Sequence, residues 1–193
     1  MSSEVQPMLE DCSIWYEDGS LKIQQFHRRG ILEGESKSWY RNGNIQEQKF
    51  YQSGELDGER KSWHKNGQLV NHGFYKNGKL EGEWKWWHHD GRLIIQKFYQ
   101  NGKPEGQFKS WHNNGNPEIY SSWKDGKREG MRKYWEMDGR ITIQEFYCDY
   151  TRIDPSFNHK KQRGFFRIKR ILLKCMICPL DSVLISDLIN ILR

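Results

Sequence analysis

Apolar and polar positions along this chain follow one pattern that returns every 24 residues. In its clearest copy, a short run ends at Trp39, an Asn-Gly dipeptide follows at 42–43, and a second run rich in β-forming residues extends from Ile45 to Tyr51. The tryptophan recurs at Trp15, Trp39, Trp63, Trp87, Trp111 and Trp135. A fixed period of this kind is the signature of a repeat architecture.

Each unit predicts a β-hairpin. An Asn-Gly or Asp-Gly dipeptide between two β-forming runs is a strong hairpin signal, because a type I′ turn needs positive φ at both central residues. All six copies have the dipeptide, at 18–19, 42–43, 66–67, 90–91, 114–115 and 138–139. A two-residue turn would pair Trp39 with Gln46, and Ser53-Gly54 and Asp57-Gly58 would bound a second, longer connection. Since a lone hairpin is marginal in water, the units should join into one antiparallel sheet of about twelve strands.

Side-chain alternation assigns residues to the two faces of this sheet. Trp39 should share one face with Phe50, whereas Tyr40, Ile45 and Tyr51 should share the other. Both faces then carry an aromatic column. One column comprises Phe26, Phe50, Phe74, Phe98 and Phe146, and the other comprises Tyr51, Tyr75, Tyr99, Trp123 and Tyr147.

One unit departs from the pattern. Between Phe108 and Met131, Pro117 occupies the slot that Leu or Ile fills elsewhere, and Ser122 occupies the phenylalanine slot. Proline at the start of a strand cannot donate a hydrogen bond to the ladder. We therefore expect the sheet to bend or loosen in this unit.

The repeated phrase resembles the MORN repeat. Gly78-Lys79-Leu80-Glu81-Gly82-Glu83 is its cleanest match, and the Trp-Tyr-x-Asn-Gly phrase at 39–43 belongs to the same pattern. The resemblance covers about Ser13 to Tyr150 and is closest to the 24-residue variant of bacterial antitoxin-like and giant-virus proteins. It implies a mainly β fold, an elongated, twisted, single-layer sheet of stacked hairpins. It also implies roles in protein scaffolding, in dimerisation and in contact with membrane phospholipid.

Charge divides the 193 residues into parts. Residues 1–11 should form a disordered, mildly acidic leader, residues 12–150 the six repeats and residues 151–193 a basic tail. The first 150 residues are electrically neutral, so the tail carries the whole net charge of +6. The N-terminus has no signal-peptide pattern, and no apolar stretch reaches the ~18 residues of a membrane span. These features predict a soluble, cytoplasmic protein.

The tail changes to a helical period after Ser156. Phe165, Ile168, Leu172 and Met176 fall on one side of a helix that Pro179 ends, and Asp181 or Ser182 can cap a second helix. The opposite side carries Arg163, Arg167, Arg170 and Lys174. Such a helical hairpin could cover the end of the sheet, lie on an anionic membrane, bind an acidic partner or support a homodimer.

The cysteines and histidines of this chain do not have the spacing of a metal site. Cys175 and Cys178 form a lone CxxC, without the second pair or nearby histidine that a zinc site needs. The four cysteines form no disulfide framework. A histidine column recurs at His64, His88 and His112, where neighbours should stand ~10 Å apart, too far to share one zinc ion. His89 should point to the face opposite His88. We predict no metal site and no cofactor.

The repeats also lack a catalytic set. An acidic column recurs at Glu33, Asp57, Glu81, Glu105 and Glu129, but its spacing exceeds the ~5 Å of a retaining glycosidase. These acids lie beside glycine turns, which favours a place at the rim. With no nucleophile motif and no phosphate-binding loop, the sequence predicts that the protein is not an enzyme.

A protein-binding surface is the leading interpretation. The central unit holds Trp84, Trp86 and Trp87, and if Trp87 fills the repeated slot, Trp84 or Trp86 is exposed to a partner. The predicted contact residues are Trp39, Trp63, Trp84, Trp86, Trp87, Trp111, Tyr51, Tyr75 and Tyr99. Neutralisation of a toxin protein is a further alternative that rests on the resemblance. Nucleic acid is excluded because the repeats lack a basic surface.

Overall fold

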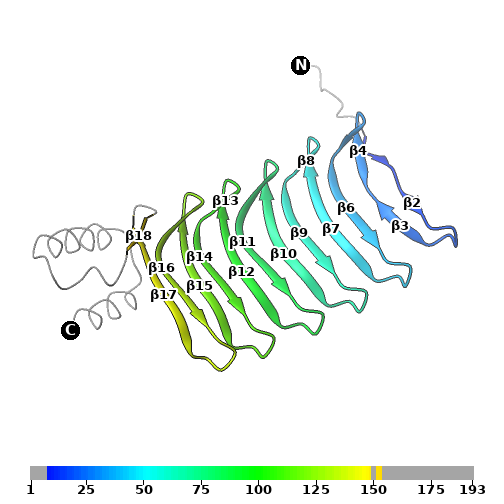
Figure 1. Ribbon diagram of the computed structural model, residues 1–193. Helices are drawn as coiled ribbons and strands as arrows, with labels where there is room; N and C mark the ends of the chain where they lie inside the picture. The colour runs from blue at the N-terminus through cyan, green and yellow to red at the C-terminus, as the bar shows by residue number, and fades with distance from the viewer. Residues whose placement is uncertain (1–7, 149–150, 154–193) are drawn as a thin grey trace, which may run out of the picture.

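Six hairpins follow one another along a single antiparallel sheet in the computed structural model, which describes residues 8–148 and 151–153 (Figure 1). They are β2 (Ile14–Trp15) with β3 (Leu21–Gln24), β6 (Gly34–Trp39) with β7 (Ile45–Gln52), β9 (Gly58–Trp63) with β10 (Leu69–Lys76), β11 (Lys79–Trp87) with β12 (Leu93–Gln100), β14 (Gly106–Trp111) with β15 (Pro117–Lys124), and β16 (Lys127–Trp135) with β17 (Ile141–Cys148). The short strands are β1 (Glu10–Asp11), β4 (Phe26–Arg28), β5 (Ile31–Leu32), β8 (Glu55–Leu56), β13 (Lys103–Pro104) and β18 (Thr151–Ile153).

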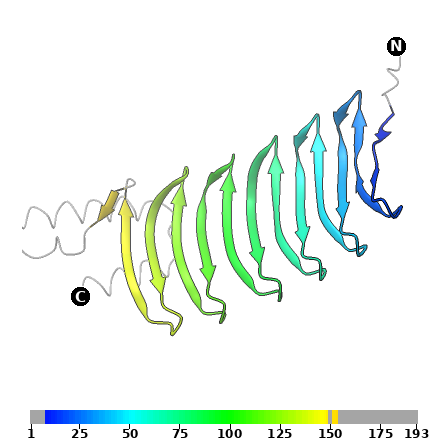
Figure 2. The ribbon, with the colours of Figure 1, turned by 45° about the vertical axis from the view of Figure 1, so that its right-hand side comes forward.

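The sheet is one curved layer. The main sheet has fifteen strands, of which thirteen run in order from β18 to β2 while β8 and β13 pair beside this path. Strands β1, β4 and β5 form a separate three-stranded sheet. Figure 2 shows the strands lying side by side across the long axis of this layer. The mainly β fold and the large antiparallel sheet are thus confirmed, whereas the predicted C-terminal helical hairpin lies outside the described residues. The described part of the chain has no helix that could cross a membrane.

The Asn-Gly slots form a different turn from the one predicted. Gly43 has a φ of 85°, but Asn42 does not have positive φ. The N–H of Gly43 donates to the carbonyl of Tyr40 over 2.9 Å, and Trp39 pairs with Ile45 instead of Gln46. This is a three-residue loop, a type I turn followed by a glycine in the left-handed conformation. The type I′ prediction was wrong here, because the loop is one residue longer than expected.

The type I′ geometry lies in the other connection of the first five repeats. Ser53 and Gly54 have φ values of 50° and 84°, and Gln52 pairs with Glu55 on either side of them. The second connection is therefore a tight turn, and the prediction of a longer one was wrong. A bulge follows it, in which the N–H of Asp57 donates to the carbonyl of Phe50 over 2.9 Å. The positive-φ residues before glycine in these turns are Arg29, Ser53, Asn77, Asn101 and Asp125.

The acidic column ties each repeat to the next at one edge of the sheet. Glu33 Oε2 accepts a hydrogen bond from the backbone N–H of Ser53 over 2.8 Å. The same contact joins Asp57 to Asn77, Glu81 to Asn101 and Glu105 to Asp125, over 2.7–3.0 Å. The backbone N–H at the start of each of these turns thus finds its hydrogen-bond acceptor in a carboxylate of the preceding unit. These four acids are structural parts of the turns.

At the opposite edge, the residue after the tryptophan makes a similar link to the next repeat in three units, through Tyr16, Tyr40 and His112. The hydroxyl of Tyr40 donates to the carbonyl of Trp63 over 2.7 Å, one repeat further along the chain. The His112 ring nitrogen lies 2.8 Å from the carbonyl of Trp135 in the equivalent contact. Neighbouring hairpins are therefore bonded along both edges as well as through their strands, which explains how a layer without a second sheet stays ordered.

Strand pairing places the two aromatic columns on opposite faces, as side-chain alternation predicted. Phe50 and Phe98 share a face with Trp39 and Trp87, which we call the phenylalanine face. Tyr51, Tyr75 and Tyr99 lie on the other, the tyrosine face. Few side chains are buried in a single layer, and the buried hydrophobic ones among the described residues are Trp84, Met131 and Cys148.

The unit with Pro117 keeps the regular ladder. Its strand β15 has eight residues, and Pro117 pairs with Trp111 as Ile45 pairs with Trp39. The predicted loosening of this unit was therefore wrong. Proline is accommodated because it stands at the first residue of the strand, directly at the bulge. The loop keeps the backbone contact found in the other units, here from His112 N–H to the carbonyl of Asn116.

Both ends of the repeat array extend past the predicted boundaries. Glu10 and Asp11, placed by sequence in the leader, form β1 and pair with β4. Thr151 and Arg152, placed in the tail, belong to β18, which pairs with β17 as β8 pairs with β7. The tail cations Arg163, Arg167, Arg170 and Lys174 lie outside the described residues.

Candidate protein-binding face

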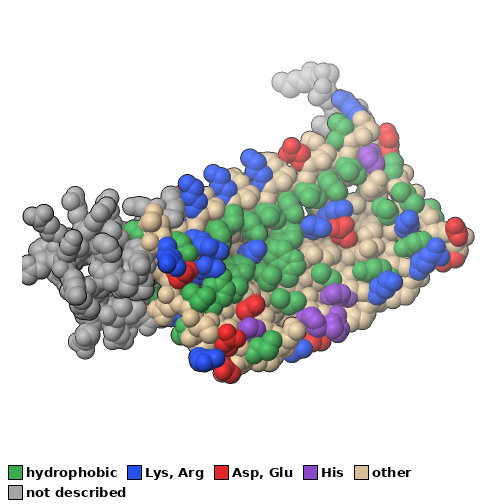
Figure 3. All heavy atoms as spheres, viewed as in Figure 1, with side chains coloured by type: hydrophobic (Ala, Val, Ile, Leu, Met, Phe, Trp, Pro, Cys, Tyr) green, Lys and Arg blue, Asp and Glu red, His purple; other side chains and the backbone are tan. Residues whose placement is uncertain are grey.

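The predicted contact residues divide between the two faces of the sheet. Strand pairing places Trp39, Trp63, Trp87 and Trp111 on the phenylalanine face. It places Trp84, Trp86, Tyr51, Tyr75 and Tyr99 on the tyrosine face. No single partner surface can touch both groups, so the nine residues do not form one site. On the tyrosine face, hydrophobic side chains gather into a central band, with Lys and Arg among them (Figure 3).

Trp84 is the centre of this band and is buried, with 4% of its surface exposed. Its indole covers the backbone of Gly73 on the adjacent strand, where an added Cβ would lie only 2.1 Å from Cε3. An aromatic ring over a cross-strand glycine is a recognised way to pack a sheet. Tyr75 and Trp86 flank the indole with ring centroids 5.4 Å away in both cases. Of the two tryptophans that the sequence offered as exposed, Trp84 is therefore buried and Trp86 is half-exposed.

Arg60 closes one side of the band. Its guanidinium lies 5.8 Å from the centre of the Trp84 ring and 2.8 Å from Glu47 Oε1. Burial opposes ionisation of Glu47, but hydrogen bonds from Lys49 and Arg60 outweigh it and lower the pKa of the carboxyl. Arg60 is thus held by an acid and by an aromatic face, and its charge is compensated within the sheet.

A shallow hollow of about 260 Å³ lies on the other side of the band. It forms where β12 and β14 part, since these strands pair only at Ile95 with Ser110 and at Gln96 with Lys109. Beyond this point β13, and not β14, pairs with β12. The side chains around the hollow include those of Lys97, Phe108, Trp123, Arg128 and Arg132.

The cations of the hollow are held mainly by aromatic rings. Lys97 Nζ lies 5.7 Å from the centre of Trp86 and 5.1 Å from that of Phe108. Arg128 lies 5.4 Å from the centre of Trp123. Arg132 differs, because its Nη1 bonds Glu145 Oε2 over 3.0 Å.

Sequence reasoning missed the hollow because its cations and Phe108 occupy no constant column. Arg128, Lys97 and Phe108 looked like ordinary substitutions within the period. A usable signal was present in the position of Phe108, where the preceding copies have Trp84, Arg60 and Ser36. A tyrosine-face position that changes in every repeat cannot be required by the repeat geometry.

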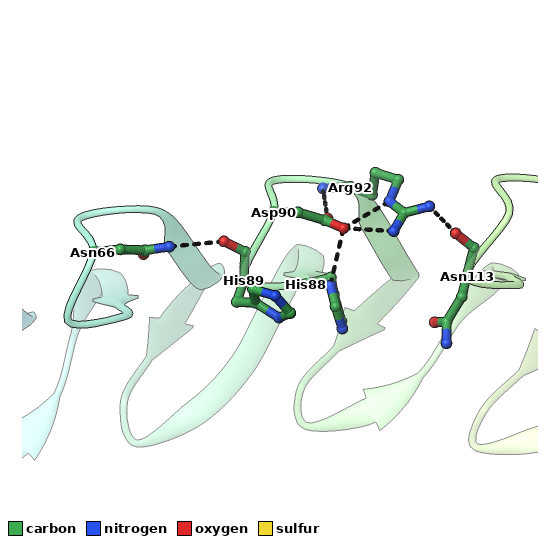
Figure 4. Close-up of polar contacts among 6 residues, drawn as sticks. All are labelled: Asn66, His88, His89, Asp90, Arg92 and Asn113. Atoms are coloured by element: carbon green, nitrogen blue, oxygen red, sulfur yellow. Dashed lines mark hydrogen bonds and ion pairs between the residues drawn. The ribbon is translucent and has the colours of Figure 1, made fainter.

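His88 and His89 lie together at the turn edge and do not point to opposite faces as predicted (Figure 4). The rings of His88 and His89 have centroids 4.1 Å apart, so the expectation that they point to opposite faces was wrong. The reason is that β11 ends at Trp87 and His89 already belongs to the turn. His88 Nδ1 lies 3.2 Å from Asp90 Oδ2, and the Arg92 side chain bonds the same carboxylate and lowers the pKa of Asp90 well below its usual value.

This histidine edge is built from structural contacts. Asn66 Nδ2 donates to the carbonyl of His89 over 2.9 Å, and Arg92 Nη1 donates to the carbonyl of Asn113. Both contacts join adjacent turns. Across residues 8–148 and 151–153, no group of three or more His, Cys, Asp or Glu side chains is placed to hold a metal ion.

Comparison with protein families identifies the repeat. The family model described as the MORN repeat variant matches residues 32–53, 56–77, 80–103 and 104–125. No curated protein matches the chain. The four matched segments cover the hairpins that carry Trp84, Trp86, Lys97 and Phe108.

Proposed function

Since residues 32–125 are four consecutive repeats of the MORN variant family, we propose that this protein is a non-enzymatic scaffold that binds a protein partner through its tyrosine face. Repeats of this family generally form non-catalytic scaffolds and often associate with proteins or membranes. The proposal narrows the predicted contact set to the members of the tyrosine face, with Trp86 as the central residue. Trp39, Trp63, Trp87 and Trp111 on the opposite face serve the architecture.

The observation that carries this proposal is the difference between repeats on the two faces. Three columns of the tyrosine face vary along the chain. They are Ser36, Arg60, Trp84, Phe108 and Arg132; Ser38, Ser62, Trp86, Ser110 and Tyr134; and Lys49, Gly73, Lys97, Ser121 and Glu145. On the phenylalanine face one column is lysine throughout, at Lys37, Lys61, Lys85, Lys109 and Lys133. Positions that the common geometry does not fix are free to recognise a partner.

The chemistry of the varied positions supports the same choice. They bring Trp86 and Phe108 together with Arg60, Lys97 and other cations on one surface, and aromatic residues and arginine are enriched in the centres of protein interfaces. Half-buried rings held by neighbours lose little conformational entropy when a partner covers them.

Site-specific photo-cross-linking tests the proposal. A photoreactive phenylalanine analogue is placed at position 86 on the tyrosine face and, in the matched control, at position 63 on the phenylalanine face. We expect a defined protein cross-link from position 86 in cell extract and none from position 63. Trp86→Ala should weaken capture of the same protein by about tenfold without loss of the folded sheet. Equal cross-linking from both positions, or capture unaffected by Trp86→Ala, contradicts the proposed face.

Membrane association is the second candidate, and the charge of the tail favours it. The nine Lys and Arg against three Asp and Glu in residues 151–193 would suit an anionic lipid surface. Because Thr151–Ile153 belong to the sheet, a deletion should begin at residue 154. Co-sedimentation with phosphatidylserine vesicles should be lost on this deletion, and binding that persists excludes the tail as the anchor. The antitoxin-like alternative rests on resemblance alone, and direct capture of a toxin protein would test it.

A further inference from the structure

We infer that the hollow beside Phe108 receives a carboxylate side chain from an acidic, extended segment of a protein partner. This inference rests on the proposed protein-binding function and names the chemistry of the partner. The residues that carry it are Lys97, Arg128 and the aromatic side chains against which they lie.

Lys97 and Arg128 differ from other cations on the tyrosine face because no carboxylate among the described residues compensates their charge. Arg60 and Lys49 share the carboxylate of Glu47, over 2.8 Å in each case. Arg132 has Glu145 at 3.0 Å. Among residues 8–148 and 151–153, no carboxylate lies within 4.0 Å of the charged nitrogens of Lys97 or Arg128. The hollow therefore has two positive charges for which the described part of the chain supplies no counter-ion.

The surroundings hold Arg128 in place without neutralising it. Its guanidinium lies 5.4 Å from the centre of the Trp123 ring and 6.0 Å from that of Tyr147. Trp123 is itself fixed, because its Nε1–H donates to Ser121 Oγ over 2.9 Å and Ser121 is only 3% exposed. Aromatic walls lower the local dielectric constant, so an incoming carboxylate would interact with these cations more strongly than at an open surface.

The balance of charge favours an acidic peptide over a lipid or a nucleic acid. A membrane surface or a phosphate backbone attracts clusters of several cations. The hollow lies within a repeat region that is neutral overall, and Glu145 and Glu118 occupy the same end of the face. Carboxylates spaced along an extended segment match two uncompensated cations that stand on different strands, β12 and β16, whereas a lipid surface or a phosphate backbone would also bring its other charges against these acids.

Peptide binding by the full chain tests the inference. The probe is a fluorescein-labelled octapeptide of alternating Glu and Tyr, with the Gln-Tyr octapeptide as its neutral match. We expect the Glu peptide to bind at least tenfold more tightly than the Gln peptide in fluorescence anisotropy. Arg128→Gln and Lys97→Gln should each weaken the Glu peptide by about tenfold, whereas Arg128→Lys, which keeps the charge, should weaken it less.

Lys85→Gln is the matched control, because Lys85 lies on the phenylalanine face and the change removes the same charge. All these variants retain the basic tail, so binding by the tail is common to them and cancels. Circular dichroism and a thermal melt establish that each variant is folded. Equal affinity for the Glu and Gln peptides overturns the inference, as does equal loss in Arg128→Gln and Lys85→Gln.

Two further outcomes separate the alternatives. If wild-type protein binds phosphatidylserine vesicles and Arg128→Gln abolishes this, the hollow accepts a lipid phosphate or carboxylate and the peptide inference is overturned. If position 86 cross-links a protein partner and Arg128→Gln leaves that capture unchanged, the proposed binding face stands and the acidic-segment inference alone fails.

Discussion

The two faces of this sheet are built on the same hairpins but differ in how far their side chains are kept from one repeat to the next. On the phenylalanine face the same ion pair returns in three consecutive units, beginning with Glu35, which bonds Lys37 over 2.7 Å and Gln48 over 2.5 Å. Glu59 and Lys61 form the same pair one repeat later. On the tyrosine face several equivalent positions change along the chain, as at Ser36, Arg60, Trp84 and Phe108. A repeat protein can thus keep one face for stability and leave the other to recognition.

The largest expected effect lies at the centre of the tyrosine face. Gly73→Ala would place a Cβ 2.1 Å from the Trp84 ring and displace the indole. We expect a loss of about 3 kcal/mol in the free energy of unfolding, measured by urea denaturation. Partner capture should also fall, because Trp86 packs against Trp84.

A double-mutant cycle checks the cause. In a Trp84→Ala background, Gly73→Ala should cost far less, because no ring remains for the new methyl to displace. If Gly73→Ala is equally damaging with and without Trp84, the contact between the glycine and the indole is not what orders this region.

A smaller effect is expected from the repeated acids of the phenylalanine face. Glu59 has a lowered pKa, mainly because of the hydrogen bond from Lys61. At Glu35 and Glu83 burial opposes ionisation, but hydrogen bonds outweigh it and the pKa values are also lowered. Replacing all three with Gln should remove about 1–2 kcal/mol of stability at neutral pH. Binding by the folded protein should stay the same.

The sign of the pH dependence follows from these lowered pKa values. Stabilisation from a carboxyl whose folded pKa is depressed is present above its ordinary value of 4.5 and is lost as the pH falls through the folded value. The difference in urea midpoint between wild type and the triple Gln variant should therefore narrow as the pH is lowered below 4.5. A difference that stays constant in acid would show that these ion pairs do not stabilise the face.

The smallest effect concerns a turn that serves both faces equally. Ser53 has a φ of 50°, a conformation that Asn tolerates better than Ser. Ser53→Asn should raise the free energy of unfolding by about 0.5–1 kcal/mol, with no change in peptide or partner binding. The equivalent position in the next repeat is already the favoured asparagine, Asn77. Asn77→Ser should therefore lower the free energy of unfolding. Changes of the same sign in both variants would contradict the conformational explanation.

The parts of the fold that depend on period alone could be predicted from the sequence. The 24-residue spacing gives the hairpins, and alternation within a strand correctly separates Phe50 from Tyr51. Turn type could not be decided, because Asn42-Gly43 and Ser53-Gly54 are both suitable dipeptides. The loop at Gly43 is one residue longer, and this is visible only when Trp39 is seen to pair with Ile45.

The candidate site was less accessible to sequence reasoning because it depends on contacts between repeats. Trp84 is buried because Gly73 lies across from it, and a glycine on the neighbouring strand is meaningful only once the register is known. Arg128 likewise has no carboxylate near its guanidinium in the described structure whereas Arg132 has Glu145, and the sequence alone does not show this difference. The tryptophan column was predicted to bind a partner because it recurs, but a residue that recurs in every repeat serves the fold that all repeats share.

The strands lie across the long axis of the layer, and each hairpin is bonded to its neighbours in the chain (Figure 1). Tension applied between the two ends would therefore pull along the interstrand hydrogen bonds and open them a few at a time, from the ends inward. Each 24-residue unit released in this way would supply about 80 Å of extended chain. Under load the sheet would act as an extensible tether, lengthening in steps of one repeat while the units still folded kept their binding surface.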